Sequence, residues 1–564
     1  MQKFLRWLDE IAVTNQESNS AKWLERIAFV FLVLMILSAP HSIAATQTAW
    51  LIGMFAWFVR LFIKPRPKLV RTSLDAALWA FFGWSVITSV FSYAPDISLD
   101  KLRGVALFLI FYFVINNLRS KRAAVFLAFA LIFSCMFNVI WTPIERLVGR
   151  GVEIHGVSAE SPLTKTIYVE NYNQNIVLKD GDALLEVNKK KIRAPEDLLS
   201  ALEQNETVRL RFYRPDYYLN VQIKRADLLT GATAMEKLGF TDWKKSRNWR
   251  SMGFYGHWTT YAEVLQLIAS LTFGLFIGFF LTQSRKVAKS QSKIRERFGN
   301  FFLPFSLSPF LLFFCLSAMS LALLLNVTRA SQLGFLVSAI SIVVLTGSRK
   351  MLLILAAVIL PVALGGLLFL QHSRNVGFFD REDESTKYRQ TVYREGFDLW
   401  TNNARHFFLG VGMDSIKRYA KDWRLFNDGK LPMGHFHSTP LQLVVERGLP
   451  ALLLWIWILG VYARTLWRGL RRGEEEKGRK GENTIHNQSK ISSSPLPLLS
   501  SSWRERGILL GCFGGLVGFF TSGLVHYNLG DAEVAMVFFI LMGISVALCD
   551  SRFQISNSIS KTAE

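Results

Sequence analysis

The sequence has little cysteine and lacks the short motifs that mark the commonest soluble enzymes. Its 4 cysteines, in a chain of 564 residues, all lie in or at the end of apolar runs, which argues against a disulfide framework and against a zinc site. A glycine-rich phosphate loop, a serine nucleophile elbow and a CxxC pair are absent. The sequence therefore gives no support to nucleotide-dependent, serine-hydrolase or thiol-redox chemistry, and we predict no cofactor.

Negative charge is also scarce. Asp and Glu number 43 against 65 Lys and Arg, which leaves a formal net charge of +22. The basic residues cluster in short loops between apolar runs, which is the positive-inside pattern of membrane proteins and not the face of a nucleic-acid-binding protein. A cleavable signal peptide is not evident, because charged residues from Lys3 to Glu10 precede the first apolar run. We therefore predict no nucleic-acid partner and a cytoplasmic N-terminus.

Apolar residues are abundant: 51% of the chain is hydrophobic, with 45 Phe and 16 Trp. A run of about 20 apolar residues can cross a bilayer. Twelve such runs, with both termini cytoplasmic, put every basic loop on the cytoplasmic side. The predicted fold is an all-α polytopic membrane protein of about 12 transmembrane helices with an inserted small α+β domain. The runs lie at about 25–42, 45–63, 74–92, 103–118, 123–142, 259–282, 304–326, 332–347, 351–370, 449–466, 507–526 and 532–549.

These runs divide the chain into segments. Residues 1–142 hold a polar cytoplasmic segment and helices 1–5, and residues 257–370 hold helices 6–9. Residues 371–448 form a large outer loop, and residues 449–564 hold helices 10–12. The linker at 467–505 is rich in Lys, Arg and Glu and then in Ser, a composition typical of disorder. We predict that this linker is cytoplasmic and disordered.

Residues 143–256 differ from the rest of the chain because they lack any spanning run. Loop alternation places them outside the cytoplasm. A turn followed by an alternating strand at 176–188, a short helix through Leu202, and strand-like pieces at Val208–Tyr213 and Tyr218–Ile223 predict a small α+β domain.

The order of small motifs in this insert resembles that of a bacterial PDZ domain over about 150–225. Ser161-Pro162 and Gly181-Asp182 match the family pattern, whereas Lys189 replaces its usual Gly. The resemblance implies binding of a peptide C-terminus by strand addition. The alternative is a degenerate PDZ domain that acts as a spacer, because a fold does not fix a function.

A histidine precedes the helix that ends the outer loop. Thr439 and Pro440 are expected to be the N-cap and first residue of this helix, and Gly448 is expected to stop it. His437 would then lie beside a helix N-terminus, whose partial positive charge disfavours the imidazolium form. A neutral imidazole is what a general base requires. The alternative is an ordinary loop histidine at a membrane surface.

Arginines accumulate on the same predicted side of the membrane. Arg329 lies in a very short outer turn, and Arg381, Arg389 and Arg394 lie in the large outer loop. Guanidinium groups suit bidentate binding of phosphate oxygens. Together with the histidine they suggest an anionic, lipid-linked substrate. The alternatives are snorkelling to lipid phosphate for Arg329 and solvated loop charges for the others.

A metal site in the outer loop is not expected. His435 and His437 are two residues apart, and an acidic run from Asp380 to Glu384 lies in the same loop. This set has no recognised ligand spacing. We interpret the acidic run as a solvated face and predict no bound metal.

The order of these motifs resembles the O-antigen ligase and polymerase superfamily of bacterial membrane glycosyltransferases. The late signature reads His437-Ser438-x-x-Leu441 and then Glu446-Arg447-Gly448, with Ser438 where Asn is commoner, and the upstream part reads Arg389, Tyr393 and Gly410-Val411-Gly412, with Phe407 in place of the usual Pro. Further matches are Arg329-Ala330-Ser331, the stretch from Gly253 to His257, and Trp84–Pro95. The resemblance covers about 20–550 without the insert.

The resemblance implies a GT-C-like, metal-independent, inverting transfer at the bacterial inner membrane. The donor would be a glycan on undecaprenyl diphosphate, and the acceptor a hydroxyl of lipid A-core or another glycan on the periplasmic face. Arg329 and Arg389 would hold the diphosphate, and His437 would take the acceptor proton. Secondary candidates are Arg394, His435, His257 and Glu446. Direct pairing of Glu446 with His437 is not expected, because nine residues put them about half a turn out of phase.

Four functions remain in competition at this level. The leading one is O-antigen ligase activity. Polymerisation of lipid-linked repeats and O-linked protein glycosylation differ from it only in the acceptor, and the PDZ-like insert suits a polypeptide. A transporter or inorganic-carbon accessory role would instead require ionisable residues near the bilayer midplane. Few such residues occur in the runs, which favours surface catalysis.

Overall fold

The computed structural model describes residues 2–12, 14, 17–169, 176–214, 217–247, 249–286, 309–347, 352–353, 384–429, 431, 434–486 and 501–550. They form two compact units. The first comprises Met1–Asn138, Phe254–Leu324 and Thr328–Glu564, and the second comprises Val139–Gly253 and Leu325–Val327.

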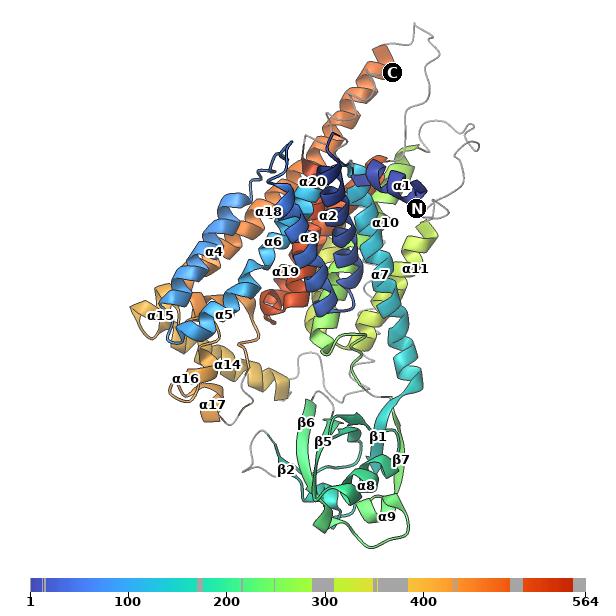
Figure 1. Cartoon of the computed structure of the whole chain (residues 1–564), viewed down its shortest axis with the longest axis vertical. Coiled ribbons are helices and arrows are strands. Elements are labelled where there is room, and N and C mark those ends of the chain that lie inside the picture. Colours follow the sequence, from blue (N-terminus) through green and yellow to red (C-terminus); the bar gives the residue numbers. More distant parts are fainter. Residues whose placement is uncertain are drawn as a thin grey trace. The chain divides into compact units, whose positions relative to one another are not determined.

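The first unit is helical (Figure 1). Its N-terminal elements are α1 (Gln2–Ala12), α2 (Asn19–Ser38), α3 (Ile43–Arg60), α4 (Asp75–Val90), α5 (Pro95–Val105), η1 (Ala106–Phe108), α6 (Leu109–Asn117) and α7 (Lys121–Val148), whose C-terminal end belongs to the second unit. Its remaining elements are α10 (Trp258–Lys286), α11 (Pro309–Asn326), α12 (Arg329–Leu345), α14 (Glu384–Thr401), α15 (Ala404–Leu409), α16 (Ile416–Tyr419), α17 (Leu425–Gly429), α18 (Thr439–His486), α19 (Ser501–Gly523), η4 (Asn528–Gly530) and α20 (Ala532–Cys549).

Six of the described helices are long and apolar enough to cross a membrane, so the chain is a multi-pass membrane protein. They are Lys121–Val148, Trp258–Leu281, Pro309–Asn326, Thr439–Arg471, Trp503–Gly523 and Ala532–Cys549, and two shorter apolar helices are Asp75–Val90 and Arg329–Leu345. The predicted ninth run, 351–370, lies outside the described residues apart from Leu352 and Leu353. The count of twelve spans therefore stays a prediction.

Small residues bring α10, α12 and α19 into close contact. A Cβ atom on Gly274 would collide with the backbone of Gly511, and one on Gly518 would collide with that of Gly334. Ser338 donates a hydrogen bond to Ser270 at 2.7 Å. Glycine and serine at helix interfaces let backbones approach closely in membrane proteins. These three helices form the tightly packed centre of the first unit.

The same contacts fix the helix directions. Gly334 lies against Gln266 and Ser338 against Ser270, so α12 runs parallel to α10. Gly507 lies against Leu275 and Gly511 against Leu271, so α19 runs antiparallel to α10. The starts of α10 and α12 and the end of α19 therefore lie at one end of the unit.

Two expectations for the helical unit are wrong. The fourth run, 103–118, is not one helix, because α5 begins at Pro95 and gives way through η1 to α6; Gly104, a poor helix former, precedes the change. The linker predicted at 467–505 does not begin at residue 467, because α18 continues to His486. Arg, Glu and Lys favour helix and can extend one already formed, whereas the composition alone suggested disorder. Residues 487–500 lie outside the described residues.

The second unit contains an antiparallel sheet with two short helices, α8 (Pro195–Gln204) and α9 (Ala234–Leu238) (Figure 1). The strand order is β2-β6-β5-β3-β1-β7, with β4 paired to β3. The remaining elements are β1 (Arg150–His155), η2 (Pro162–Thr164), β2 (Ile167–Tyr168), β3 (Ala183–Val187), β4 (Lys190–Lys191), β5 (Thr207–Arg214), β6 (Tyr217–Lys224), η3 (Arg225–Asp227) and β7 (Asp242–Ser246).

The second unit has its own apolar core, to which Leu184, Leu198 and Phe212 contribute from β3, α8 and β5. Alternation of apolar and polar residues along β5 places one face of that strand in the core. Strand β7 pairs with β1 and ends the sheet. It lies beyond the 150–225 segment on which the PDZ resemblance rests, and that resemblance stays a prediction.

Candidate functional site

His437 lies immediately before α18 in a strained backbone conformation. Its φ is 46°, in the left-handed region that side chains other than glycine seldom adopt. The Tyr393 hydroxyl donates to its main-chain carbonyl at 2.8 Å. Within the described part of the chain, its Nδ1 is buried and has no hydrogen-bond partner. Strained residues of this kind cluster at functional sites.

The cap of α18 differs by one residue from the sequence prediction. Ser438, not Thr439, caps the helix, because its carbonyl accepts the N–H of Gln442 at 2.9 Å and its hydroxyl accepts the N–H of Leu441 at 3.4 Å. Thr439 instead donates its N–H to the carbonyl of His526 at 3.2 Å and its hydroxyl to Asn528 at 2.9 Å. The predicted stop at Gly448 is confirmed, because the backbone leaves helical geometry there.

The contact between Thr439 and His526 brings three histidines together. The ring centroids of His435 and His437 are 4.3 Å apart, and those of His437 and His526 are 6.2 Å apart. The N–H of His437 donates to Nδ1 of His435 at 3.1 Å. Among the described residues, His435, His437 and His526 are the group arranged so that it could hold a metal ion. The prediction against a metal considered His435, His437 and the acidic run from Asp380 to Glu384, and it did not include His526.

Burial and charge give the three histidines different protonation states. Burial, with the charges of His526, Arg389 and His257, lowers the pKa of His437 to about 3. Burial, with His437 and His526 among its neighbours, lowers the pKa of His435 to about 2. Both rings are therefore neutral near pH 7 and can accept a proton or bind a metal.

His526 is the exception in the cluster. Burial alone would lower its pKa, but the carboxylate of Glu263, 2.9 Å from its Nδ1, raises that pKa above the ordinary value. The Glu263 side chain is 1% exposed. Burial first, and then the proximity of His526, hold the pKa of His437 below its ordinary value.

The predicted arginines occupy different positions. Arg389 is half-buried on α14, and its charge acts on both His437 and His526. It makes no hydrogen bond or ion pair with any residue that the structure describes. Arg394 is exposed and lies about 140° further around the same helix. Arg329 opens α12 at the same end of the unit as His257 and His526, whereas Arg381 lies outside the described residues.

Glu446 supports the histidine segment without touching His437. Its carboxylate accepts the N–H of Asp414 at 3.0 Å and the amide of Gln442 at 2.8 Å. Gln442 in turn accepts the N–H of Phe436 at 2.8 Å. The described partners of Glu446 are Asp414, Gln442 and Arg447 and do not include His437, so Glu446 acts as a buried anchor for two loops.

The Gly-Val-Gly and Glu-x-Gly motifs interlock. Gly412 donates its N–H to the carbonyl of Glu446 at 2.9 Å, and Val411 donates to Val445 at 2.8 Å. Pro450 has no N–H, so the Glu446 carbonyl would otherwise lack a helical donor. A Cβ on Gly410 would collide with the backbone of Arg447. This explains why glycine is required where the two segments touch.

The early motif contacts the same segments. Trp84 donates to the carbonyl of Arg447 at 2.8 Å, and the N–H of Tyr93 donates to the carbonyl of Val411 at 3.2 Å. Ser92 and Ser415 hydroxyls are 2.8 Å apart. Residues more than 300 positions apart in the sequence therefore form one scaffold that joins the early motif to the two late motifs.

Sequence reasoning missed His526 and Glu263. His526 lies in an apolar region without a motif, but Glu263 carried a signal, since a carboxylate near the start of a spanning helix is a functional candidate by default. His257, an exposed secondary candidate, precedes α10 and acts electrostatically on His435 and His437. Tyr388, whose ring lies edge-on to His437 at 5.4 Å, was also missed.

A known protein family matches part of the chain. Residues 314–456 match the sequence model of the family described as O-antigen ligase. The match contains Arg329, Arg389, Arg394 and the segment from His435 to Glu446. It supports a membrane enzyme of the O-antigen ligase and polymerase type, in general a glycosyltransferase that uses a lipid-linked glycan donor and a glycan acceptor. No curated protein matches the chain.

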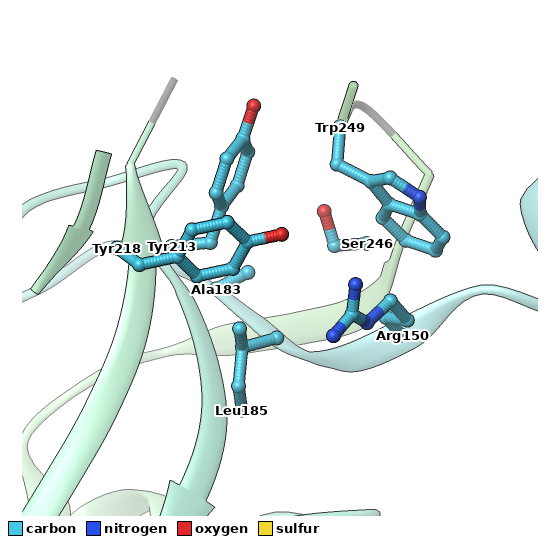
Figure 2. Close-up of a pocket in the computed structure, with 7 residues that line it drawn as sticks. All are labelled: Arg150, Ala183, Leu185, Tyr213, Tyr218, Ser246 and Trp249. Carbon is cyan, nitrogen blue, oxygen red and sulfur yellow. The ribbon is translucent and has the colours of Figure 1, made fainter. Parts of the chain in front are cut away.

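A separate small pocket lies within the second unit (Figure 2). Figure 2 shows the Arg150 guanidinium below the ring of Trp249, and the cation is 5.7 Å from the ring centroid. The pocket is lined by Arg150, Ala183, Leu185, Tyr213, Tyr218, Ser246 and Trp249. None of these is a predicted site residue, so the pocket adds nothing to the transfer chemistry.

Proposed function

We propose that this protein transfers a glycan from undecaprenyl diphosphate to an acceptor hydroxyl on the periplasmic face of the bacterial inner membrane. The leading acceptor is lipid A-core, as for an O-antigen ligase. The observation that carries the proposal is the neutral, strained His437, which lies within the electrostatic reach of Arg389. A base and a phosphate-binding cation at one site suit attack on a glycosyl diphosphate.

In the proposed reaction, His437 accepts the proton of the acceptor hydroxyl as its oxygen attacks the anomeric carbon. The bond between that carbon and the diphosphate oxygen breaks, and both electrons leave with undecaprenyl diphosphate. Arg389 and Arg329 neutralise the charge that develops on this leaving group. The residues that act are the protein's own, and the proposed transfer needs no metal.

The groups around His437 have supporting roles in this scheme. Burial, together with the nearby His526, favours the unprotonated form of His437 before the attack, and Tyr393 holds the His437 backbone. Glu446 and Gln442 fix the approach to α18. His435, His257 and Arg394 are secondary candidates, because none of them combines burial, neutral charge and a free nitrogen as His437 does.

The acceptor distinguishes this proposal from its close relatives. A polymerase would use a second lipid-linked repeat, and an O-linked oligosaccharyltransferase would use a polypeptide. Strand β7, which ends the sheet of the insert, supports the latter, since an extended peptide can add to such an edge. A transporter function is less favoured. A transporter would need ionisable residues near the bilayer midplane, whereas Glu263 lies near the start of its helix.

The test is transfer in vitro from a labelled undecaprenyl-diphosphate glycan. Purified protein receives lipid A-core, a second lipid-linked repeat or periplasmic protein extract in separate reactions. Label on lipid A-core identifies a ligase, label on the repeat a polymerase, and label on protein an oligosaccharyltransferase. A protein that does not bind the donor at all would overturn the proposal and favour the transporter or accessory role.

A further inference from the structure

The cluster of His435, His437 and His526 has a second chemical capacity. Their potential ligand atoms all lie within 4.8 Å of one another. Zinc binds imidazole nitrogen at about 2.0–2.1 Å, which puts two ligating nitrogens roughly 3.4 Å apart in a tetrahedral site. Closing the cluster to that spacing requires the ligand atoms to move from separations of at most 4.8 Å to about 3.4 Å. We propose that these three histidines form a binding site for a divalent transition metal such as Zn²⁺.

The outer contact of His526 matches that of a metal ligand. Metal-bound histidines commonly direct their second ring nitrogen at a carboxylate, which fixes the ring and increases its basicity. Glu263 approaches Nδ1 of His526 to 2.9 Å from within α10. With Nδ1 directed at Glu263, Nε2 is the nitrogen of His526 that would bind the metal. A buried carboxylate also offsets part of the charge that a cation would bring.

The other two histidines lie close to His526. The ring centroid of His435 is 5.5 Å from that of His526, and that of His437 is 6.2 Å from it. Nδ1 of His437 is buried without a hydrogen-bond partner among the described residues. Such an orphaned acceptor is costly unless something occupies it. A metal on this nitrogen would satisfy it.

Two features limit the affinity of the site. His435 Nδ1 already accepts the N–H of His437, so ligation either replaces this hydrogen bond or displaces the proton on Nε2. Arg389 adds positive charge close to His437. Because both the hydrogen bond and the nearby positive charge oppose metal binding, we expect a site that binds metal reversibly and not a permanently filled structural site.

The ligand set also selects the class of metal. Three imidazoles suit zinc, cobalt, nickel and copper, whereas magnesium and calcium prefer oxygen ligands. A metal on His437 occupies the lone pair that the proposed transfer requires. Zinc would therefore inhibit transfer, and a chelator would restore it; this consequence rests on the proposed function, but metal binding itself does not.

Direct binding tests the site without an activity assay. The full-length protein is purified without a polyhistidine tag, reconstituted in nanodiscs and titrated with Zn²⁺ by calorimetry, with Mg²⁺ as a comparison. Co²⁺ titration gives an absorption spectrum that reports its coordination. We expect one zinc per chain, a cobalt spectrum of low coordination number, and no binding of magnesium.

Variants assign the ligands. His526→Ala and His435→Ala should each weaken zinc binding at least tenfold, and Glu263→Gln, which keeps the side-chain shape, by about tenfold. His155→Ala, in strand β1 of the insert, is the matched control and should bind zinc as the wild type does. Thermal melting verifies that each variant is folded.

The proposal is overturned if the folded wild-type protein binds no zinc, or if both histidine variants bind it with wild-type affinity. The outcome is separable from that for the proposed function. If the wild-type protein binds zinc and the His437→Ala variant still transfers glycan, the metal site is upheld and His437 is rejected as the base. If the wild-type protein binds no zinc but the His437→Ala variant loses transfer, His437 is upheld as the base and the metal site is rejected.

Discussion

The hydroxyl of Tyr393 holds the main-chain carbonyl of His437 at 2.8 Å. Tyr393 lies four residues after Arg389 on α14, so the helix that carries the candidate diphosphate ligand also fixes the candidate base. At this spacing the two residues share one face of the helix. If donor binding moves Arg389, the position of His437 should therefore also change.

Removing this hydrogen bond should impair transfer without unfolding the protein. In Tyr393→Phe the His437 backbone loses its anchor, which is worth about 1 kcal/mol, or roughly a fivefold effect. We expect a lower kcat and little change in donor KM, since the phenol does not contact phosphate in the proposed scheme. Steady-state transfer kinetics measure this split. A fall in donor affinity alone would contradict the positioning role.

Arg389 and Arg394 form a matched pair on one helix. Arg389→Ala should raise donor KM by about tenfold or more, because a charge-assisted contact to phosphate is lost and such contacts are worth about 1.5–3 kcal/mol. Arg394→Ala, at an exposed position, should leave donor binding nearly unchanged. Equal effects of the two substitutions would show that general loop charge, and not Arg389, holds the donor.

The pair of Glu263 and His526 predicts a pH-dependent contribution to stability. Because the pKa of His526 is raised above 6.5 in the folded protein, its stabilising effect is complete below pH 6.5 and is lost as pH rises through the folded-state value. Glu263→Gln removes the cause, and burial should then lower the pKa of His526. The variant should melt below the wild type in acid, and the difference should narrow in alkali. Melting temperatures from about pH 5 to about pH 8 test this, and a difference that grows with pH would contradict it.

Glycine is required where the two late motifs meet. Gly412 has a φ of 98°, and a Cβ there would collide with the Ser92 hydroxyl. Gly412→Ala should therefore lower the melting temperature and reduce transfer. Gly460→Ala in α18 is the control, since nothing lies within 4 Å of its added Cβ, and alanine favours helix over glycine by about 1 kcal/mol. A Gly412→Ala protein as stable as the wild type would reject the interlocking of the motifs.

The sequence predicted those elements that depend on local pattern. Most of the predicted apolar runs correspond to described helices, apart from the fourth run and the ninth, and the strand predicted at Val208–Tyr213 lies within β5. The break at Gly448 also follows from local chemistry, because glycine tolerates the φ of 72° found there. The continuation of α18 to His486 did not follow, since a composition typical of disorder is also compatible with helix.

The parts of the site that depend on long-range packing could not be predicted. Glu263 meets His526 because α10 and α19 pack closely through Gly274 and Gly511, a contact between segments more than 200 residues apart. His526 reaches His437 through the backbone of Thr439. No spacing rule connects these positions, so the cluster of three histidines emerges only in the folded chain.

The central claim is that His437 is the base of a glycan transfer, and the most direct measurement compares His437→Ala with the wild type. His437→Asn is added because asparagine tolerates the left-handed backbone of this position. Each protein is given the undecaprenyl-diphosphate glycan and the acceptor that the wild type uses, and donor binding and melting temperature are measured in parallel. We predict that both variants fold and bind the donor but transfer at least about 10²-fold more slowly, the usual contribution of a general base. Transfer at the wild-type rate by either folded variant would contradict the account.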